Sequence, residues 1–239
     1  MTTLQALPAR VITVDGPSGT GKGTIAARLA SLLGWHVLDT GALYRCVGLA
    51  AVQRGVALDD DAALGDLANG LHIGFDGERV LLDGSDVSSD IRTAAAGEHA
   101  SRVAACPAVR RALWRLQREA VRPPGLVADG RDMGTVVFPE AEVKIYLDAS
   151  PEVRVERRYK QLKEKGMDAN VPDLARELAE RDRRDRERSV SPMEPAADAV
   201  VIDTSSLGIE AVLVAVLGEV RRVLPDAVPD AVPDALSVI

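Results

Sequence analysis

The chain has 239 residues, 46% of them hydrophobic and 3% aromatic, with a formal net charge of −7 at pH 7. That length allows one well-packed domain with insertions, or two small ones, and the apolar fraction is ordinary for a globular protein. The acidic charge argues against a general nucleic-acid-binding protein, and no apolar run approaches the length of a membrane span.

The first predicted strand, residues 11–15, leads directly into a glycine-rich loop at residues 16–24. Residues 22–33 then have apolar side chains at helical spacing, and Gly34 ends the pattern. A strand, a tight glycine arc and a helix N-terminus are typical of a phosphate-binding loop, because backbone N–H groups converge on phosphate oxygens. Lys22 would add a mobile cation for the β and γ phosphates.

The loop departs from the general phosphate-loop rule at one position. The rule asks for Ser or Thr directly after Gly-Lys, whereas Gly23 follows Lys22 here and the hydroxyl arrives at Thr24. A Gly-Lys-Gly-Thr ending is typical of nucleoside monophosphate kinases; the alternative is a glycine-rich turn with a chance lysine. We expect ATP to bind at Gly16, Pro17, Ser18, Gly19, Thr20, Gly21, Lys22, Gly23 and Thr24, with Thr24 as the direct or near ligand of Mg²⁺.

A second strand at residues 35–39 and a helix at 41–54 follow, and this alternation predicts an α/β fold with a parallel sheet. Residues 39–45 lie at the carboxyl end of that strand, where open α/β sheets bind ligands. The same residues also fit a helix start with Thr40 as the cap, and the two interpretations are compatible.

The middle of the chain breaks the alternation. Residues 71–75 and 79–83 predict a β-hairpin around an Asp-Gly turn, residues 86–92 are irregular and polar, and residues 97–121 are helical with a break near Pro107. We interpret residues 59–107 as an insertion carried by a core of residues 10–58 and 108–224.

Strands at 125–129, 141–148 and 199–203 complete a predicted five-stranded parallel sheet, with helices at 151–165, 172–188 and 209–224. Residues 1–224 therefore form one predicted domain. From Pro225 a Pro-Asp-Ala-Val repeat places a proline at every fourth position, which excludes a regular helix. We expect residues 225–239 to be a disordered, dispensable tail.

Arginines are concentrated on the two helices that flank Gly166, and this flap covers residues 154–188. A helix–loop–helix flap would bring both clusters to one anionic ligand, because a guanidinium grips phosphate oxygens in pairs. The alternative is a solvated helix pair with weak surface ion pairs. The clusters are Arg154, Arg157, Arg158 and Lys160, and Arg181, Arg183, Arg184, Arg186 and Arg188.

Residues 129–132, Asp-Gly-Arg-Asp, lie at the carboxyl end of the third core strand and are candidates for contacts to a polar substrate. The alternative is a turn in which Asp129 pairs with Arg131. The two cysteines, Cys46 and Cys106, have no partner at metal-ligand spacing, so we expect reduced thiols in a cytoplasmic protein.

Together these segments resemble the bacterial cytidylate kinases, a group of P-loop nucleoside monophosphate kinases. The resemblance covers most of residues 11–223, and its most specific part is the run at residues 129–138, Asp-Gly-Arg-Asp-Met-Gly-Thr-Val-Val-Phe. Other matching segments are residues 16–24, 39–45, 91–93, 143–150 and 181–188. The resemblance implies a core, an insert over the nucleoside monophosphate, a short arginine-bearing lid, and a monomer.

The resemblance also implies individual roles. Thr40, Arg110, Asp132 and Arg188 would line a cytosine pocket, Ser101, Arg181 and Asp185 would meet the sugar, and Arg45 and Arg131 would hold the acceptor phosphate. We therefore expect phosphoryl transfer from ATP, with Mg²⁺, to CMP or dCMP, with no nucleic-acid or membrane partner.

The acceptor oxygen is already ionised at neutral pH, so we expect catalysis by alignment and charge neutralisation, without a side-chain base. Lys22, Arg131, Arg157 and Arg158, with Arg154, are the candidate catalytic cations. Two alternatives stay open: a kinase of another small acceptor, such as an adenylate, uridylate or shikimate kinase, and a nucleotide-dependent switch.

Overall fold

The computed structural model describes residues 9–77, 79–164, 166 and 168–229. Its centre is a five-stranded sheet in the order β2-β6-β1-β7-β8, and every neighbouring pair is parallel. The predicted five-stranded parallel sheet is confirmed. The strands are β1 (Arg10–Asp15), β2 (His36–Asp39), β6 (Gly125–Asp129), β7 (Val143–Asp148) and β8 (Val200–Asp203).

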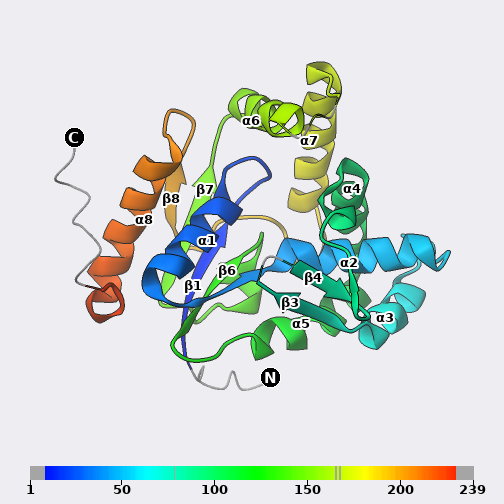
Figure 1. Cartoon of the computed structure of the whole chain (residues 1–239), viewed down its shortest axis with the longest axis horizontal. Coiled ribbons are helices and arrows are strands. Elements are labelled where there is room, and N and C mark those ends of the chain that lie inside the picture. The colour runs from blue at the N-terminus through cyan, green and yellow to red at the C-terminus, as the bar shows by residue number, and fades with distance from the viewer. Residues whose placement is uncertain (1–8, 78, 165, 167, 230–239) are drawn as a thin grey trace.

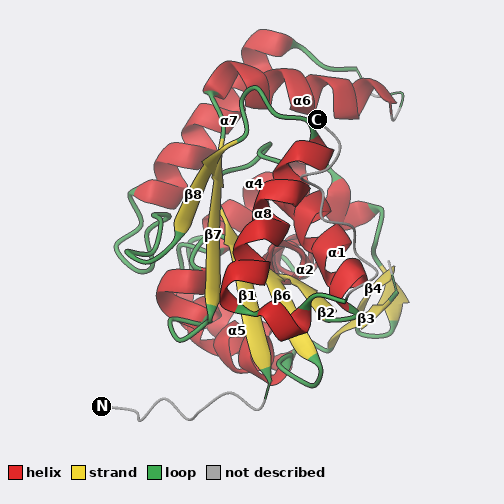
Figure 2. Ribbon diagram, turned by 90° about the vertical axis from the view of Figure 1, so that its left-hand side faces the viewer, coloured by secondary structure: helices red, strands yellow, loops and turns green. Residues whose placement is uncertain are grey.

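Helices cover both faces of this sheet, as Figure 2 shows. On one face α1 (Lys22–Leu33) and α8 (Ile209–Val223) pack against Ile12 and Val14 of β1. On the other face α2 (Thr40–Gln53) and α5 (Pro107–Glu119) belong to the cluster that contains Val11. Because both faces are covered, β1 and β6 are nearly continuous apolar runs instead of alternating ones.

The insert lies to one side of the sheet, beyond β2 (Figure 1). It contains α3 (Asp61–Gly70), β3 (Ile73–Asp76), β4 (Arg79–Leu82), β5 (Ser85–Asp86), a 3-10 turn (Asp90–Arg92) and α4 (Ala94–Val103). β3 and β4 pair antiparallel, which confirms the hairpin. Neither α3, which contains two glycines, nor the short β5 was predicted.

The segment predicted to be a lid contains most of α6 (Pro151–Glu164) and all of α7 (Val171–Arg186), which stand side by side above the carboxyl ends of the strands (Figure 1). A small apolar cluster of Val155, Leu162 and Leu174 joins them. Arg154 of α6 and Asp182 of α7 also form a buried ion pair of 2.6 Å. The lid is therefore one packed unit.

Two helix starts differ from the predictions. The cap of α2 is Asp39, whose carboxylate accepts the N–H of Ala42 at 3.1 Å. The prediction of Thr40 as cap is wrong, because the Thr40 hydroxyl donates instead to the carbonyl of Asp129 at 2.8 Å. α4 begins at Ala94, before the predicted residue 97, because Thr93 caps it by accepting the N–H of Ala96.

The start of the proline-rich tail is ordered against the core. Pro225–Ala227 form a 3-10 turn, and Val228 is 8% exposed beside the α1–α8 cluster. Asp226 accepts two hydrogen bonds of 2.9 Å from Arg10. The prediction of a disordered tail is therefore wrong for residues 225–229, because a turn and one apolar anchor tolerate proline; residues 230–239 lie outside the described part.

None of the described helices is long and apolar enough to cross a membrane.

Candidate functional site

The glycine-rich loop joins β1 to α1 at the carboxyl edge of the sheet. Gly16, Gly19 and Gly21 have φ angles of 141°, 84° and 88°, which side chains strongly disfavour. A Cβ on Gly16 would lie 2.0 Å from the Leu147 carbonyl oxygen, so no other residue fits. No side chain caps α1, so its first N–H groups face the loop. The loop thus has the backbone geometry expected of an anion-binding arc.

Lys22 lies inside this arc and is 8% exposed. Its ammonium donates to the Pro17 carbonyl at 3.1 Å. Burial, together with the nearby Arg131 and Arg181 charges, lowers the pKa of Lys22 to about 7, although Asp129 opposes the shift. A bound phosphate would supply the missing negative charge.

Two guanidinium groups, those of Arg131 and Arg181, lie close to Lys22, and Arg45 lies close to Arg181. Arg131 donates to the Ser18 hydroxyl at 2.8 Å and pairs with Asp185 at 3.2 Å, so it connects the glycine loop to the lid. Burial and the Arg131 charge lower the pKa of Arg181 to about 9. Nitrogens of Arg45 and Arg181 lie 3.3 and 3.4 Å from the position that a Cβ on Gly97 would occupy. Such crowding of cations is typical of a site for polyanions.

A second group of polar side chains is almost fully buried between the core and the insert. Arg110 and Asp132 form an ion pair with side chains 8% and 3% exposed. Arg110 also donates to the Ser191 hydroxyl at 3.2 Å. One terminal nitrogen of Arg188 is buried without a hydrogen-bond partner. A buried carboxylate with adjacent guanidinium groups can recognise donors and acceptors on a flat polar ring.

Asp185 connects the insert, the core and the lid. It accepts from the Ser101 hydroxyl of α4 at 2.9 Å and from Arg131 at 3.2 Å, and Arg181 lies 3.9 Å away. Burial alone would raise the pKa of Asp185, but Arg131, Arg181 and Arg188 hold it below its usual value. The structure thus brings Ser101, Arg131, Arg181 and Asp185 together.

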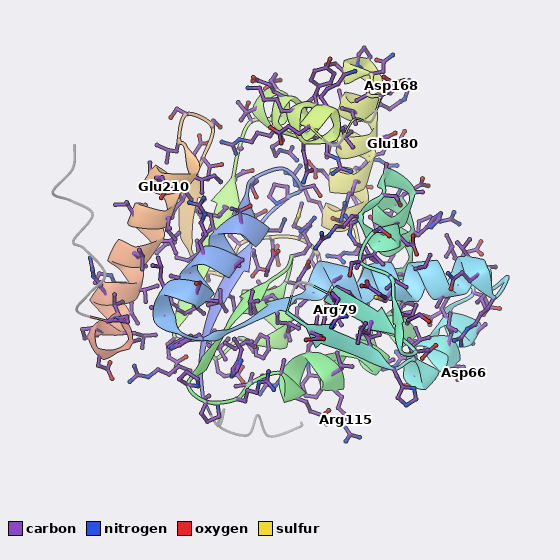
Figure 3. The ribbon with its side chains drawn as sticks, in the orientation of Figure 1. Asp66, Arg79, Arg115, Asp168, Glu180 and Glu210 are labelled. Atoms are coloured by element: carbon purple, nitrogen blue, oxygen red, sulfur yellow. The ribbon has the colours of Figure 1, made fainter. Side chains whose placement is uncertain are left out.

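Two of the three candidate lid arginines are directed toward backbone carbonyls. Arg154 donates to the carbonyls of Ala149 and Ser18 at 3.1 and 3.3 Å. Arg157 donates to the carbonyls of Thr204 and Leu207 at 2.6 and 3.2 Å. Among the described residues, Arg158 bonds only within its own helix, to Gln161 at 2.7 Å. Exposed charged residues such as Asp168, Glu180 and Glu210 lie on the outside of the molecule, away from this site (Figure 3).

Asp129 contributes more to the site than the sequence analysis assigned to it. One of its oxygens is buried and has no hydrogen-bond partner among the described residues, and the other lies 3.1 Å from where a Cβ on Gly23 would be. Burial raises the pKa of Asp129 to about 6, opposed by Lys22. Arg131 forms its ion pair with Asp185, so the simple Asp129–Arg131 turn is wrong.

Asp15 was not predicted to contribute to the site. Its carboxylate accepts the N–H groups of Met133 and Gly134 at 2.9 and 2.8 Å. The available signal was a carboxylate at the end of an otherwise apolar strand, directly before the glycine loop.

Comparison with known proteins identifies relatives along nearly the whole chain. The family model described as cytidylate kinase matches residues 12–222. A cytidylate kinase from Aeromonas hydrophila is 55% identical over 222 residues, covering 91% of this chain and 96% of the relative. One from Bordetella bronchiseptica is 56% identical over 209 residues, covering 87% and 94%. One from Methylococcus capsulatus is 55% identical over 214 residues, covering 88% and 96%.

Proposed function

Since the chain belongs to the cytidylate kinase family, it phosphorylates CMP and dCMP with ATP, and we propose that it does so by direct in-line transfer between two adjoining anion sites. The reaction gives ADP with CDP or dCDP. The acceptor is itself a phosphate group, so the nucleophilic oxygen is ionised without help from a side-chain base.

The observation that carries this proposal is the crowding of buried cations where the glycine loop meets the lid and insert. The pKa values of Lys22 and Arg181 fall to about 7 and about 9, through burial and then through neighbouring positive charge. Two nucleotides facing each other there would relieve this repulsion. Arg131 lies between the two sites, because it bonds both Ser18 and Asp185.

The donor side of the proposal is residues 16–24. The loop amides and Lys22 hold the phosphates of ATP, and Arg131 neutralises charge on the transferring group. Arg158 joins it when the lid closes, because its only bond among the described residues is to Gln161. Arg157, in contrast, would have to leave the carbonyls of residues 204–207 to reach a phosphate.

The acceptor side uses the insert and the end of β6. Arg45 and Arg131 hold the CMP phosphate, and Ser101, Arg181 and Asp185 contact the sugar. Asp132 accepts from the cytosine amino group, while Arg110 and Arg188 donate to ring acceptors, with Thr40 at the edge of the pocket. Uracil has an oxygen where cytosine has the amino group, and the Asp132 carboxylate would repel it.

The residues beside the loop also fit a magnesium ion. Asp129 has a buried oxygen without a partner, and the Thr24 side chain begins the first turn of α1. No group of three potential ligands exists among the described residues, so the cation would take most of its ligands from phosphates and water. When bound, Mg²⁺ neutralises charge on the β and γ oxygens. We also place the enzyme in the cytoplasm as a monomer acting on free nucleotides.

The test is a coupled assay of ADP release with CMP, dCMP, UMP and AMP as acceptors. We expect CMP and dCMP to be used far better than the other two. Equal or better use of AMP or UMP would overturn the assignment of the base pocket, and ATP hydrolysis without an acceptor would favour a nucleotide-dependent switch.

A further inference from the structure

Asp15 connects the donor loop to the segment that follows the acceptor-binding residues. It ends β1, one residue before Gly16, and is 5% exposed. Its two oxygens accept the N–H groups of Met133 and Gly134, at 2.9 and 2.8 Å. These amides open the π-helical turn Met133–Val137, directly after Asp132.

A carboxylate at the buried end of β1 has a high desolvation cost. The preceding β1 residues Val11, Ile12 and Val14 are fully buried, and an apolar residue would complete the same strand without desolvating a charge. Burial raises the pKa of Asp15 to about 7. The two hydrogen bonds from backbone amides oppose this rise, whereas the negative charges of Asp132 and Asp129 add to it. The carboxylate must therefore contribute something that an apolar side chain cannot, namely two acceptors for adjacent backbone donors.

Those two amides would otherwise be the unsatisfied first donors of a helical turn. The turn also closes on Asp132, whose carbonyl accepts from Val136 and Val137 at 2.9 and 3.2 Å. On the other side of Asp132, the Gly130 N–H donates to the Val14 carbonyl of β1 at 3.1 Å. Hydrogen bonds to the end of β1 therefore fix the backbone both before Arg131, at Gly130, and after Asp132, at Met133 and Gly134.

We infer that Asp15 is a positioning residue that fixes the direction of Asp132 and so sets the preference for cytosine over uracil. This inference rests on the proposed role of Asp132 as the group that reads the base. Asp15 touches neither nucleotide in this scheme; it acts through the backbone of residues 133 and 134.

The test is Asp15→Asn, measured as the ratio of kcat/KM for CMP to kcat/KM for UMP. The amide keeps the size of the side chain but presents an NH₂ group to one of the two N–H donors. We expect the ratio to fall about tenfold, as hydrogen-bond selectivity is lost. KM for CMP should rise while KM for ATP changes less than about twofold, because the loop amides stay in place. The ratio does not depend on the amount of active enzyme, so a merely structural loss would not move it.

Thr13→Val is the matched control. Thr13 lies two residues earlier on β1, is fully buried, and has a hydroxyl without a partner. That hydroxyl lies 3.0 Å from where a Cβ on Gly134 would be, so the control alters the same surroundings but leaves both amide bonds. We expect the parent ratio; a fall equal to that of Asp15→Asn would overturn the inference.

Two further variants separate the inference from the function beneath it. If Asp132→Asn lowers the ratio of kcat/KM for CMP to kcat/KM for UMP and Asp15→Asn does not, the inference is wrong and the proposed base pocket stands. If Asp132→Asn keeps the parent ratio, the proposed base reading itself fails. Should Asp15→Asn not fold, Gly134→Ala displaces the same segment, since its Cβ would lie 3.0 Å from the Thr13 hydroxyl and 3.2 Å from the Lys144 side chain, closer than ordinary contacts; an unchanged ratio there also overturns the inference.

Discussion

At the scale of single residues, the surroundings of Lys22 in the free protein favour the binding of an anion. It is buried, bonded only to a carbonyl among the partners that the structure gives it, and close to Arg131 and Arg181. Burial and the two guanidinium charges lower the pKa of Lys22. A triphosphate tail reverses the balance, because it brings negative charge to the point where positive charge is crowded.

Lys22→Ala should lower kcat about 10³-fold, because one phosphate-binding cation in a phosphoryl-transfer site has an effect of that order. The measurement is ADP release with saturating CMP. Lys160→Ala is the control: this lysine is on α6, its side chain is 67% exposed, and within the described part of the chain its ion pair is with Glu156 of the same helix. Parent turnover in Lys22→Ala would remove Lys22 from the mechanism.

Binding of ATP should also take up a proton above pH 7. The pKa of Lys22 is about 7 in the free protein, so at pH 8 most of the molecules lack this proton, and bound phosphates raise the pKa again. We expect KM for ATP to rise between pH 7 and 9. Calorimetric titration at pH 8 in two buffers of different ionisation enthalpy measures the proton directly; identical heats in both buffers would contradict the expectation.

Asp132→Ala should narrow the preference for CMP over UMP, since the carboxylate that accepts from the amino group is gone. It should also lower the free energy of unfolding by about 3–5 kcal/mol, because Arg110 is left as a buried, unpaired charge. The two effects are read separately, as a kcat/KM ratio and as a urea unfolding curve. A destabilised variant with the parent ratio would leave Asp132 a structural role only.

At the scale of elements, the acceptor site depends on how closely α4 packs against α2. A Cβ on Gly48 of α2 would lie 2.8 Å from the Cβ of His99 in α4. α4 also carries Gly97, beside Arg45 and Arg181, and Ser101, which bonds Asp185. The distance between these two helices therefore sets the positions of several proposed CMP contacts.

Gly48→Ala should push the two helices apart. We expect a loss of about 1–3 kcal/mol in the free energy of unfolding from overpacking and a higher KM for CMP. Gly218→Ala is the matched control, because Gly218 lies inside α8 with nothing within 4 Å of an added Cβ. It should be neutral or stabilising by up to about 1 kcal/mol. Equal behaviour of the two variants would contradict the packing argument.

The elements of the core could be predicted because their signals are local. The apolar strands, the glycine loop and the Asp-Gly hairpin are each determined by a few neighbouring residues. Thr40 shows the limit: its neighbours suggest a cap, but its hydroxyl bonds Asp129, 89 positions away in the chain. The amide partners of Asp15, the carbonyl partners of Arg157 and the order of Val228 depend in the same way on distant segments, so the local pattern could not show them.

At the scale of the whole molecule, the two proposed nucleotide sites lie at the carboxyl edge of the sheet, on the side where α6 and α7 stand (Figure 1). Arg131 donates hydrogen bonds to Ser18 of the glycine loop and to Asp185 of α7. Arg154 of α6 donates to the Ser18 carbonyl and so connects the proposed lid to the same loop. Movement of the lid is therefore coupled to the donor loop. Closure over both nucleotides would exclude water from the transferring phosphoryl group.

A chain ending at residue 229 should match the parent in activity and stability, whereas one ending at residue 224 should lose about 2 kcal/mol of unfolding free energy. The shorter chain lacks Val228, whose burial is worth about that amount, and the exposed Asp226–Arg10 pair, which adds little. Thermal unfolding of both chains measures this. Equal stability of the two would show that Val228 contributes nothing.

The Arg10–Asp226 contact has a topological consequence. The first residue of β1 and the turn after α8 are joined by two hydrogen bonds of 2.9 Å, so the two ends of the described part of the chain come together on one surface. A short peptide could close them into a ring, and the ring could be reopened in an exposed loop to give a circular permutant with the same sheet. Because that meeting point is far along the strands from the glycine arc, new ends could be chosen without touching the chemistry.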